Sequence, residues 1–291
     1  MSSPCLICGQ ATVAHGQAKI RCRHEGYFRR CESCGFVFIE NVTWLPEAYA
    51  EAINASDTGY VARNLACRDR VRMFIELFLN STGKFLDYAA GYGLFVRMMR
   101  DFGYDFRWAD RYCQNLFARG FEEPLPLKGS FEAVTAFEVL EHMVNPMQEI
   151  TELAAAAQCL IFSTNLLPQP APAPADWWYY GLDQGQHVSF YTVQSLEILA
   201  RRFGFHLVSD GSAFHVFSRQ SVSARRFRRI DNRWWKRWIG RTRRRQPRVW
   251  SDYMDMRNRF FKAGEEAGSQ APCGNMTTTD SASEPRHGNC T

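Results

Sequence analysis

The chain has 291 residues, 46% of them hydrophobic and 14% aromatic, which suits one large folded domain plus a small one and excludes a disordered chain. It contains no run of about 18 apolar residues, and its first twenty residues hold two cysteines and no apolar stretch, so we expect neither a membrane span nor a signal peptide and predict a cytoplasmic protein. The net charge of +5 is uneven, because residues 221–250 carry twelve Lys or Arg and one acid, which leaves the rest of the chain negative.

Four of the ten cysteines form two C-x-x-C pairs near the N-terminus. They are Cys5, Cys8, Cys31 and Cys34. In a reducing compartment such pairs indicate a metal rather than disulfides, and four thiolates make a closed tetrahedral site for Zn²⁺. A short segment has too little core to fold alone, so we predict a structural zinc ribbon over residues 1–45. Free or redox-active thiols are the alternative, and Cys22 or His24 could replace one ligand.

From about residue 60 the sequence alternates between helical and strand-like patterns. In chain order these predict a helix over 61–79, a strand over 84–88, a helix over 94–102, strands over 106–109 and 131–137, a helix over 145–157, a strand over 159–163, a helix over 192–203, and strands over 206–209 and 215–218. A further strand near 116–122 is only weakly marked. Such alternation predicts a parallel sheet with helices on both faces, and the closing strand pair indicates one antiparallel member.

Three segments do not follow this alternation. Residues 166–190 form a long loop rich in proline and aromatics; loops of this length are usually functional or disordered, and the aromatics favour an ordered one. Residues 221–262 are basic and rich in tryptophan. Residues 263–291 are polar and nearly free of large apolar groups, so we expect a disordered tail.

The turn after the strand over 84–88 has the features of a ligand site. Gly91 and Gly93 let the backbone approach a ligand closely, and the helix that follows points its first N–H groups at an anion, such as the carboxylate of a methionine moiety. Asp87 can accept from the ammonium group of that moiety, and Asp110, at the end of the next strand, from two ribose hydroxyls. A dinucleotide site is disfavoured because Val96 stands where its fingerprint needs a third small residue. A tight turn without a ligand is the other alternative.

Three segments resemble class I S-adenosylmethionine-dependent methyltransferases, in particular the subgroup that acts on small molecules. They are the turn over 85–93 with Asp110, the run Phe-Glu-Ala-Val-Thr-Ala-Phe-Glu-Val-Leu-Glu-His over 131–142, and Gly-Gln-His-Val-Ser-Phe-Tyr over 185–191. The resemblance implies an α/β methyltransferase domain over 60–220, with a Rossmann-like seven-stranded sheet of order 3-2-1-4-5-7-6 whose last strand is antiparallel. It also implies that the cofactor binds to Asp87, Ala89, Gly91, Gly93, Asp110 and Glu138. Ala89 stands where the family has glycine, and alanine tolerates a close approach but not a positive φ.

Two histidines are candidates for the chemistry. Methyl transfer is an in-line displacement that depends largely on positioning, with a base where the acceptor is a hydroxyl or a carbon acid. His142 ends the run over 131–142, and His187 lies in the long loop near the aromatic residues 177–180, which could form a floor under a sugar or aryl ring. We predict both as catalytic or substrate-contacting residues, since histidine titrates near neutrality. A structural role in holding the loop is the alternative. We expect Glu141 to be a solvated or helix-starting charge.

The predicted function is methyl transfer to a small-molecule acceptor. A four-cysteine zinc module ahead of such a domain resembles methyltransferases that modify nucleotide-linked sugars, so a sugar or a cell-envelope glycan precursor is the specific hypothesis. The alternatives are an RNA methyltransferase and a non-catalytic binding protein on the same fold. Methylation of nucleobase amino groups is disfavoured, because Phe137-Glu-Val-Leu stands where that class carries Asn/Asp-Pro-Pro-Tyr/Phe.

The basic segment over 221–262 has three interpretations. Arginine interleaved with tryptophan suits peripheral contact with an anionic membrane, at its inner face for a cytoplasmic protein. The same composition suits nucleic acid, which we favour less, or a protein partner. Membrane contact would suit an enzyme that acts on cell-envelope precursors.

Overall fold

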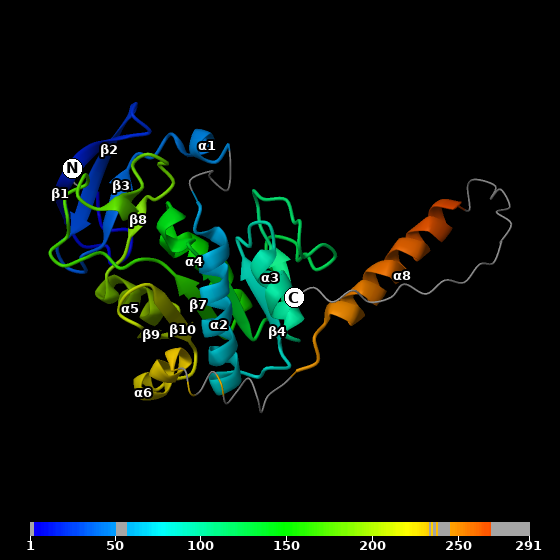
Figure 1. Cartoon of the computed structure of the whole chain (residues 1–291). Coiled ribbons are helices and arrows are strands. Elements are labelled where there is room, and N and C mark those ends of the chain that lie inside the picture. The colour runs from blue at the N-terminus through cyan, green and yellow to red at the C-terminus, as the bar shows by residue number, and fades with distance from the viewer. Residues whose placement is uncertain (1–2, 51–56, 233, 235–236, 238–244, 269–291) are drawn as a thin grey trace, which may run out of the picture. The chain divides into compact units, whose positions relative to one another are not determined.

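The structure, a computed structural model, describes residues 3–50, 57–232, 234, 237 and 245–268 (Figure 1). The chain divides into two compact units, Met1–Arg248 and Val249–Thr291. In the second unit the described residues form one helix, α8 (Val249–Gly268). Residues 269–291 of the predicted disordered tail lie outside the described residues. None of the described helices is both long enough and apolar enough to cross a membrane.

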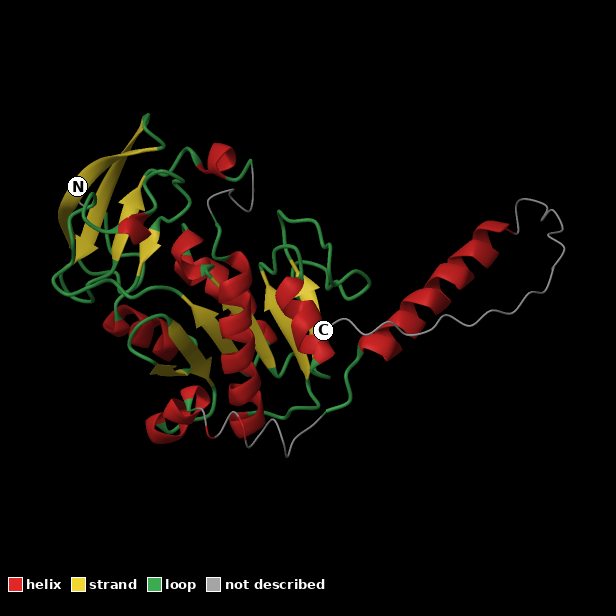
Figure 2. Cartoon of the chain, in the orientation of Figure 1, coloured by secondary structure: helices red, strands yellow, loops and turns green. Residues whose placement is uncertain are grey.

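Six strands form the central sheet of the described residues, in the order β5-β4-β6-β7-β10-β9 (Figure 2). They are β4 (Lys84–Tyr88), β5 (Asp105–Ala109), β6 (Ala133–Phe137), β7 (Cys159–Ser163), β9 (His206–Ser209) and β10 (Phe214–Ser218). The strands β5, β4, β6 and β7 are parallel, and β10 is antiparallel to both of its neighbours. The Rossmann-like sheet and its antiparallel strand are therefore confirmed.

The sheet differs from the expected seven strands at one edge. Where the weakly marked strand was predicted, the described residues form a single parallel bridge between Trp108 and Glu122. The Trp108 N–H donates to the Phe121 carbonyl oxygen over 2.9 Å. Pairing stops there because Pro124 and Pro126 follow closely, and proline has no N–H to donate to a ladder.

Four helices cover the two faces of the sheet. They are α2 (Tyr60–Phe78), α3 (Leu94–Asp101), α4 (Pro146–Ala156) and α5 (Val193–Arg202). Successive side chains of a strand point to opposite faces, so Phe85 and Leu86 of β4 enter different apolar clusters. Phe85 packs in the cluster of α2 and α3, and Leu86 in that of α4 and α5. The parallel strands therefore end together at one edge of a sheet that is buried on both sides.

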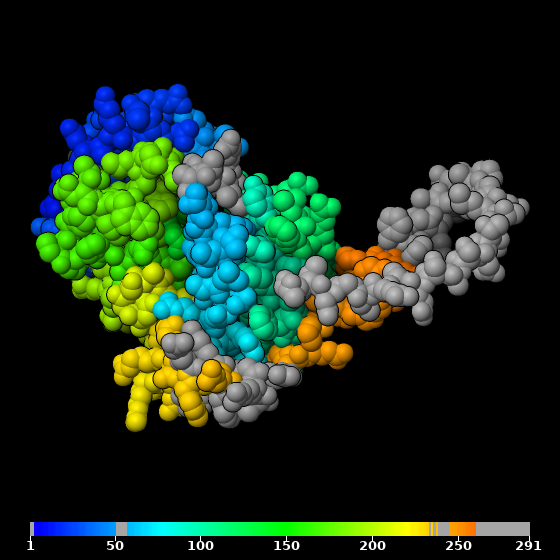
Figure 3. Space-filling view, in the orientation of Figure 1, coloured from blue at the N-terminus to red at the C-terminus, as the bar shows by residue number. Residues whose placement is uncertain are grey.

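The N-terminal module is a second, antiparallel sheet of β1 (Thr12–Ile20), β2 (His24–Cys31), β3 (Val37–Glu40) and β8 (Ser189–Phe190). Its fourth strand comes from the long loop after β7, with Val37 opposite Phe190. In Figure 3 the blue N-terminal surface lies directly against green surface from this part of the chain. The segment predicted as a zinc ribbon and the segment predicted as the methyltransferase domain therefore contribute strands to the same sheet. The division of the chain into domains at residues 45 and 60 stays a prediction.

The start of the basic segment is packed onto the first unit. It forms α6 (Ala224–Phe227) and a 3₁₀ turn, η3 (Arg228–Asp231). Phe227 and Ile230 are buried in the same cluster as Phe74 of α2. Arg70 of α2 forms an ion pair of 2.9 Å with Asp231. Much of the tryptophan-rich part, residues 233, 235–236 and 238–244, lies outside the described residues.

Candidate functional site

The turn between β4 and α3 is held by its own backbone. The Ala90 N–H donates to the Ala109 carbonyl of β5 over 3.2 Å, and the Gly93 N–H donates to the Ala90 carbonyl over 3.0 Å. Gly91 has φ 55° and Ala89 has φ 53°. The expectation that alanine at position 89 would avoid positive φ is wrong. The surrounding hydrogen bonds impose that conformation, at a cost of about 1–2 kcal/mol for a residue with a Cβ.

The two glycines of the turn serve different purposes. Gly91 lines the cavity described below, where the backbone lies open to a ligand. Gly93 has φ 84° and is the N-cap of α3. A Cβ on Gly93 would lie 2.7 Å from Asn115 Oδ1, so this glycine is required by packing.

Asp87, the fourth residue of β4, is buried where the parallel strands end. Its Oδ1 accepts a hydrogen bond of 2.5 Å from the Thr135 hydroxyl of β6. Burial, and to a lesser extent the charge of Asp110, raises the pKa of Asp87 to about 7. A buried carboxylate with little compensation is suited to a cationic ligand.

Asp110 follows β5 and is fixed by backbone donors. Its Oδ2 accepts from the Gly91 N–H over 2.8 Å, and its Oδ1 accepts from the N–H groups of Tyr112 and Cys113 over 2.7 and 2.8 Å. These contacts join the end of β5 to the turn after β4. The carboxylate therefore has one fixed orientation at the cavity wall.

Glu138 follows β6 with φ 53°, a strained conformation for a residue with a side chain. Its carboxylate accepts from the Ser163 hydroxyl over 2.6 Å and from the Tyr179 hydroxyl over 3.3 Å. These bonds hold Glu138 over the middle of the sheet edge, between Asp87 and the long loop.

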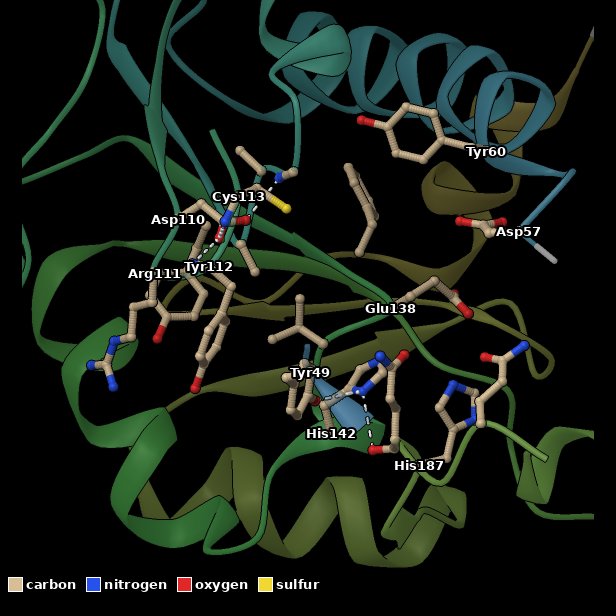
Figure 4. A pocket seen from close by; sticks show the side chains of 18 of the residues that line it. Tyr49, Asp57, Tyr60, Asp110, Arg111, Tyr112, Cys113, Glu138, His142 and His187 are labelled. Carbon is tan, nitrogen blue, oxygen red and sulfur yellow. Dashed lines mark hydrogen bonds between the residues drawn. The ribbon is translucent and has the colours of Figure 1, made fainter. Parts of the chain in front are cut away.

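A cavity of about 910 Å³ opens at this edge of the sheet (Figure 4). The predicted cofactor residues Asp87, Ala89, Gly91, Asp110 and Glu138 line it, as do His142 and His187. Gly93, which was also predicted to bind the cofactor, does not line the cavity. In Figure 4 Asp110 lies on one side of the cavity, whereas Glu138 lies near His142 and His187 on another.

The two histidines face each other with their ring planes perpendicular and 4.9 Å between centroids. His142 Nδ1 lies 3.1 Å from the Gln186 carbonyl and 2.9 Å from the Tyr49 hydroxyl. His187 Nδ1 lies 2.7 Å from the Tyr179 carbonyl. Burial, and then the neighbouring His187, lowers the pKa of His142 to about 3, and burial also lowers the pKa of His187. Both rings are therefore neutral at physiological pH.

The comparison with protein families agrees with this geometry. Residues 60–210, more than half of the chain, match the model of a family described as a methyltransferase domain. The chain belongs to this family. It is an S-adenosylmethionine-dependent methyltransferase with the Rossmann-like fold that the sequence resemblance implied.

Solved methyltransferases show a similar fold at low sequence identity. One is a chain from the complex of the Haloferax volcanii Trm112 methyltransferase activator with a methyltransferase. It shares 14% sequence identity with this chain at a TM-score of 0.44, and the match covers 60% of this chain and 98% of the other. An O-methyltransferase family protein from Burkholderia thailandensis is 14% identical at a TM-score of 0.38, and the match covers 62% of this chain and 64% of the other. The Synechocystis magnesium protoporphyrin IX methyltransferase with bound S-adenosylhomocysteine is 14% identical at a TM-score of 0.39, and the match covers 61% of this chain and 95% of the other. A search among curated proteins finds no match.

Sequence reasoning missed several residues of this methyltransferase's cavity. Tyr49, from the segment after α1 (Leu45–Ala48), lines the wall beside His142 and stacks on Tyr112 with 5.1 Å between ring centroids. Tyr179 belongs to the aromatic run that the sequence marked, but its hydroxyl bonds to carboxylates were not visible there. No local pattern distinguishes Tyr49, because its role depends on how the N-terminal module packs against the sheet.

Glu141 corrects a prediction, because it is fully buried instead of solvated. It lies in a 3₁₀ turn, η1 (Leu140–His142), and its Oε1 accepts from the Tyr179 hydroxyl over 2.6 Å. Burial, and then the charge of Glu138, raises its pKa well above the usual value. The sequence favoured a solvated Glu141 because a charged residue that follows a strand is usually exposed. In the structure the long loop covers this residue.

The four predicted metal-ligating cysteines come together. Their sulfur atoms all lie within 4.8 Å of one another, with 3.6 Å between Cys5 and Cys34 and 3.4 Å between Cys8 and Cys31. These separations are far too long for disulfides, which need about 2.05 Å. They are close to the distance of about 3.8 Å between sulfurs of a tetrahedron with Zn–S bonds of about 2.3 Å. The four thiols therefore fit one zinc ion.

Proposed function

We propose that this methyltransferase transfers a methyl group from S-adenosylmethionine to a small molecule with hydroxyl groups, with a sugar or a cell-envelope glycan precursor as the specific hypothesis. The observation that supports it is that one cavity is lined by the predicted cofactor residues, by two histidines and by several aromatic side chains. The βα turn and the strand ends have the donors and acceptors for the cofactor. The histidines and the aromatic rings would face an acceptor.

The cofactor would be held by the turn and by two strand ends. Asp87 would accept from the ammonium group of the methionine moiety, and Asp110 would accept from the ribose hydroxyls. The open backbone at Ala89 and Gly91 allows a close approach. Glu138 lies beyond Asp87, toward the acceptor. When bound, the cofactor supplies the electrophilic methyl group, and the chain supplies its orientation.

The acceptor would lie between the imidazoles and the aromatic side chains of the wall. His142 and His187 would contact it, as the sequence predicted. Trp178 is 79% exposed although it lines the cavity, and Tyr112 is 66% exposed. Exposed aromatic rings at a cavity mouth suit a planar face or the apolar face of a sugar ring. The cavity is thus open on the side where we place the acceptor.

We further propose that zinc occupies the four-cysteine cluster and has a structural role. Four protein ligands leave no open position on the ion, so no catalytic water is expected. The cluster would hold the module that carries Tyr49 to the cavity wall. The Thr192 hydroxyl, at the start of α5, donates to the Cys34 carbonyl over 2.6 Å and fastens the cluster to the main domain.

Peripheral membrane contact through residues 221–262 stays a prediction. Phe227 and Ile230 are buried in the first unit and are not available to a bilayer. Trp234 is 62% exposed, as an interfacial residue would be.

Calorimetric titration of the zinc-loaded protein with S-adenosylmethionine and S-adenosylhomocysteine tests the cofactor. We expect micromolar binding and a loss of more than about tenfold in Asp110→Ala, since each charge-assisted hydrogen bond contributes about 1.5–3 kcal/mol. The control is Asp101→Ala, which removes an exposed carboxylate of α3 that pairs with Arg97. Absence of binding by folded protein would contradict the assignment of the cavity.

Transfer of a labelled methyl group to a panel of acceptors tests the substrate class. The panel contains nucleotide sugars, lipid-linked glycans, simple phenols and structured RNA. We expect transfer to a hydroxylated small molecule. Transfer to RNA alone would contradict the proposed class and support the RNA alternative; cofactor binding without transfer to any acceptor would support the non-catalytic one.

A further inference from the structure

Three side chains of types that bind metals meet at the cavity wall, where His142 and His187 line the cavity and Glu141 is buried behind it. One ligand atom from each of Glu141, His142 and His187 lies within 4.8 Å of the other two. Glu141 and His142 are neighbours in η1, whereas His187 comes from the loop before β8. Figure 4 shows the two imidazoles side by side at the cavity wall. The cluster is separate from the four cysteines of the N-terminal module.

The hydrogen bonds of the histidines determine which nitrogen is free. His142 Nδ1 lies beside the Gln186 carbonyl, and His187 Nδ1 lies beside the Tyr179 carbonyl. A carbonyl oxygen can only accept, so Nδ1 of His187 carries the proton and its Nε2 keeps its lone pair. The Gln186 carbonyl favours the same tautomer of His142, whose Nδ1 then donates while the Tyr49 hydroxyl, 2.9 Å away, accepts. Metal-binding histidines are oriented in this way, with the second nitrogen donating to a carbonyl or a carboxylate.

Glu141 adds an unsatisfied acceptor. Its Oε1 accepts from Tyr179, but its Oε2 is buried and has no hydrogen-bond partner among the described residues. A buried carboxylate oxygen without a partner is costly, and most such atoms in folded proteins are satisfied by a donor, a water or an ion. A cation at the cluster would satisfy this atom.

The segments that carry the ligands are fastened to each other. The Val188 N–H donates to the Glu141 carbonyl over 2.7 Å, and the Ser189 hydroxyl donates to the Met143 carbonyl over 2.7 Å. The Gln186 side chain donates to the Ala48 carbonyl over 2.8 Å. The three ligands are therefore pre-organised, which favours binding because little ordering is left to do.

We propose that Glu141, His142 and His187 bind one divalent first-row transition cation on the acceptor side of the methyltransferase cavity. Two imidazoles and one carboxylate suit a first-row transition cation such as Mn²⁺, Fe²⁺, Co²⁺ or Zn²⁺ better than Mg²⁺ or Ca²⁺, which prefer oxygen ligands. Three protein ligands leave coordination positions open for a bound molecule, and two of the three, His142 and His187, line the cavity. The site would thus be a binding site in its own right.

The role of the cation rests on the proposed function. An acceptor hydroxyl bound to the cation loses its proton to solvent at a lower pH, because the cation stabilises the alkoxide. The acceptor oxygen then forms the bond to the methyl carbon while the bond from that carbon to the sulfonium sulfur breaks, and its electron pair stays on sulfur. The two histidines would act through the cation and not as bases.

Paramagnetic resonance of Mn²⁺ tests the site. The protein is loaded with one equivalent of Zn²⁺, which the four thiolates bind in preference to the cluster of Glu141, His142 and His187, and is then titrated with Mn²⁺, which prefers oxygen and nitrogen ligands to thiolates. We expect one bound Mn²⁺ per chain and echo modulation from the nitrogens of two imidazoles. His187→Gln and Glu141→Gln should each weaken binding by more than about tenfold. The matched control, His206→Gln on an exposed part of β9, should leave it unchanged.

The outcomes separate this inference from the proposed function. Titration with S-adenosylmethionine reports whether each variant keeps the folded cofactor half. Cofactor binding without bound Mn²⁺, or with Mn²⁺ that lacks imidazole nitrogens, overturns the metal site and leaves the proposed function standing. Imidazole-bound Mn²⁺ in a protein that binds no cofactor supports the metal site and overturns the proposed function. The wild-type spectrum decides the matter even where a variant fails to fold.

Discussion

Asp87 shows how one buried residue can make cofactor binding depend on pH. Its pKa of about 7 arises mainly from burial, which disfavours the carboxylate. In the proposed cofactor site, the ammonium group would need that carboxylate as an acceptor. We therefore expect the affinity for S-adenosylmethionine to fall about fivefold from pH 7 to pH 6, as Asp87 takes up a proton. Calorimetry between pH 5.5 and 7 measures this, with Asp87→Asn as the variant that should bind weakly at every pH.

The sign for stability is opposite to that for binding. The pKa of Asp87 is higher in the folded protein, at about 7, than in the unfolded protein, at about 3.9. Its contribution to the free energy of unfolding is therefore fully present below about pH 3.9 and is lost as the pH rises through about 7. The cofactor-free protein should thus lose stability from this group as the pH approaches 7. An affinity independent of pH between 5.5 and 7 would contradict the pairing of Asp87 with the ammonium group.

At the residue scale, the sequence indicated chemistry better than conformation. The gathering of Asp87, Gly91 and Asp110 at one cavity could be predicted because a βα turn at a strand end is a local feature, whereas Gly93 does not line that cavity. The positive φ of Ala89 could not be predicted, because it is imposed by hydrogen bonds to β5. The burial of Glu141 could not, because the residue that covers it, Tyr179, is 38 positions away.

At the scale of elements, the start of α5 joins the cysteine cluster to the main domain. The Thr192 hydroxyl accepts from the Ser195 N–H over 3.1 Å as a helix cap and donates to the Cys34 carbonyl over 2.6 Å. Both partners are buried. One hydroxyl thus satisfies a helix terminus and a carbonyl of the four-cysteine cluster.

Thr192→Val should lower the free energy of unfolding by about 1–2 kcal/mol, because valine keeps the shape but loses the cap and leaves a carbonyl without its donor. Denaturant unfolding of the zinc-loaded protein measures the change. Thr151→Val on the exposed side of α4, where the hydroxyl donates to Met147, is the control and should change stability by less than about 0.5 kcal/mol. Equal effects at the two sites would argue against the junction.

The predicted helices and strands of the main domain correspond closely to those in the structure, because their signals are local: apolar periodicity, N-caps and terminal glycines. The edge strand near 116–122 is the exception, reduced to one bridge where prolines end the ladder. The two-residue β8 was also not predicted. Its strand character depends on pairing with β3, which is about 150 positions away.

At the scale of the whole molecule, the N-terminal module is part of the cavity. The Trp44 ring N–H donates to the Gly185 carbonyl over 2.8 Å, and Tyr49 contacts His142. These contacts and β8 connect the four-cysteine cluster to the loop that carries His187. Loss of order in the module should therefore reach the acceptor side of the site first.

Zinc removal tests this connection. A chelator should increase the hydrogen exchange of amides over 185–190, since a small metal module loses its fold without the ion. Amides of β4 and β6, in the middle of the main sheet, should stay protected. Mass spectrometry of exchanged peptides, with the zinc-loaded protein as reference, measures both. Unchanged exchange over 185–190 would show that the loop does not depend on the module.

The sequence by itself determined the family, the sheet order apart from one edge strand, the cofactor turn and the four cysteines. Each of these rests on residues close together in the chain, where spacing alone fixes which side chains share a turn or a face. Only the tertiary structure decided which residues line the side of the cavity that we propose for the acceptor, because Tyr49 and His142 are 93 positions apart and His187 reaches them from a third segment. Packing between distant segments leaves no period in a sequence, so the burial of Glu141 and its position beside two imidazoles could be seen only in the folded chain.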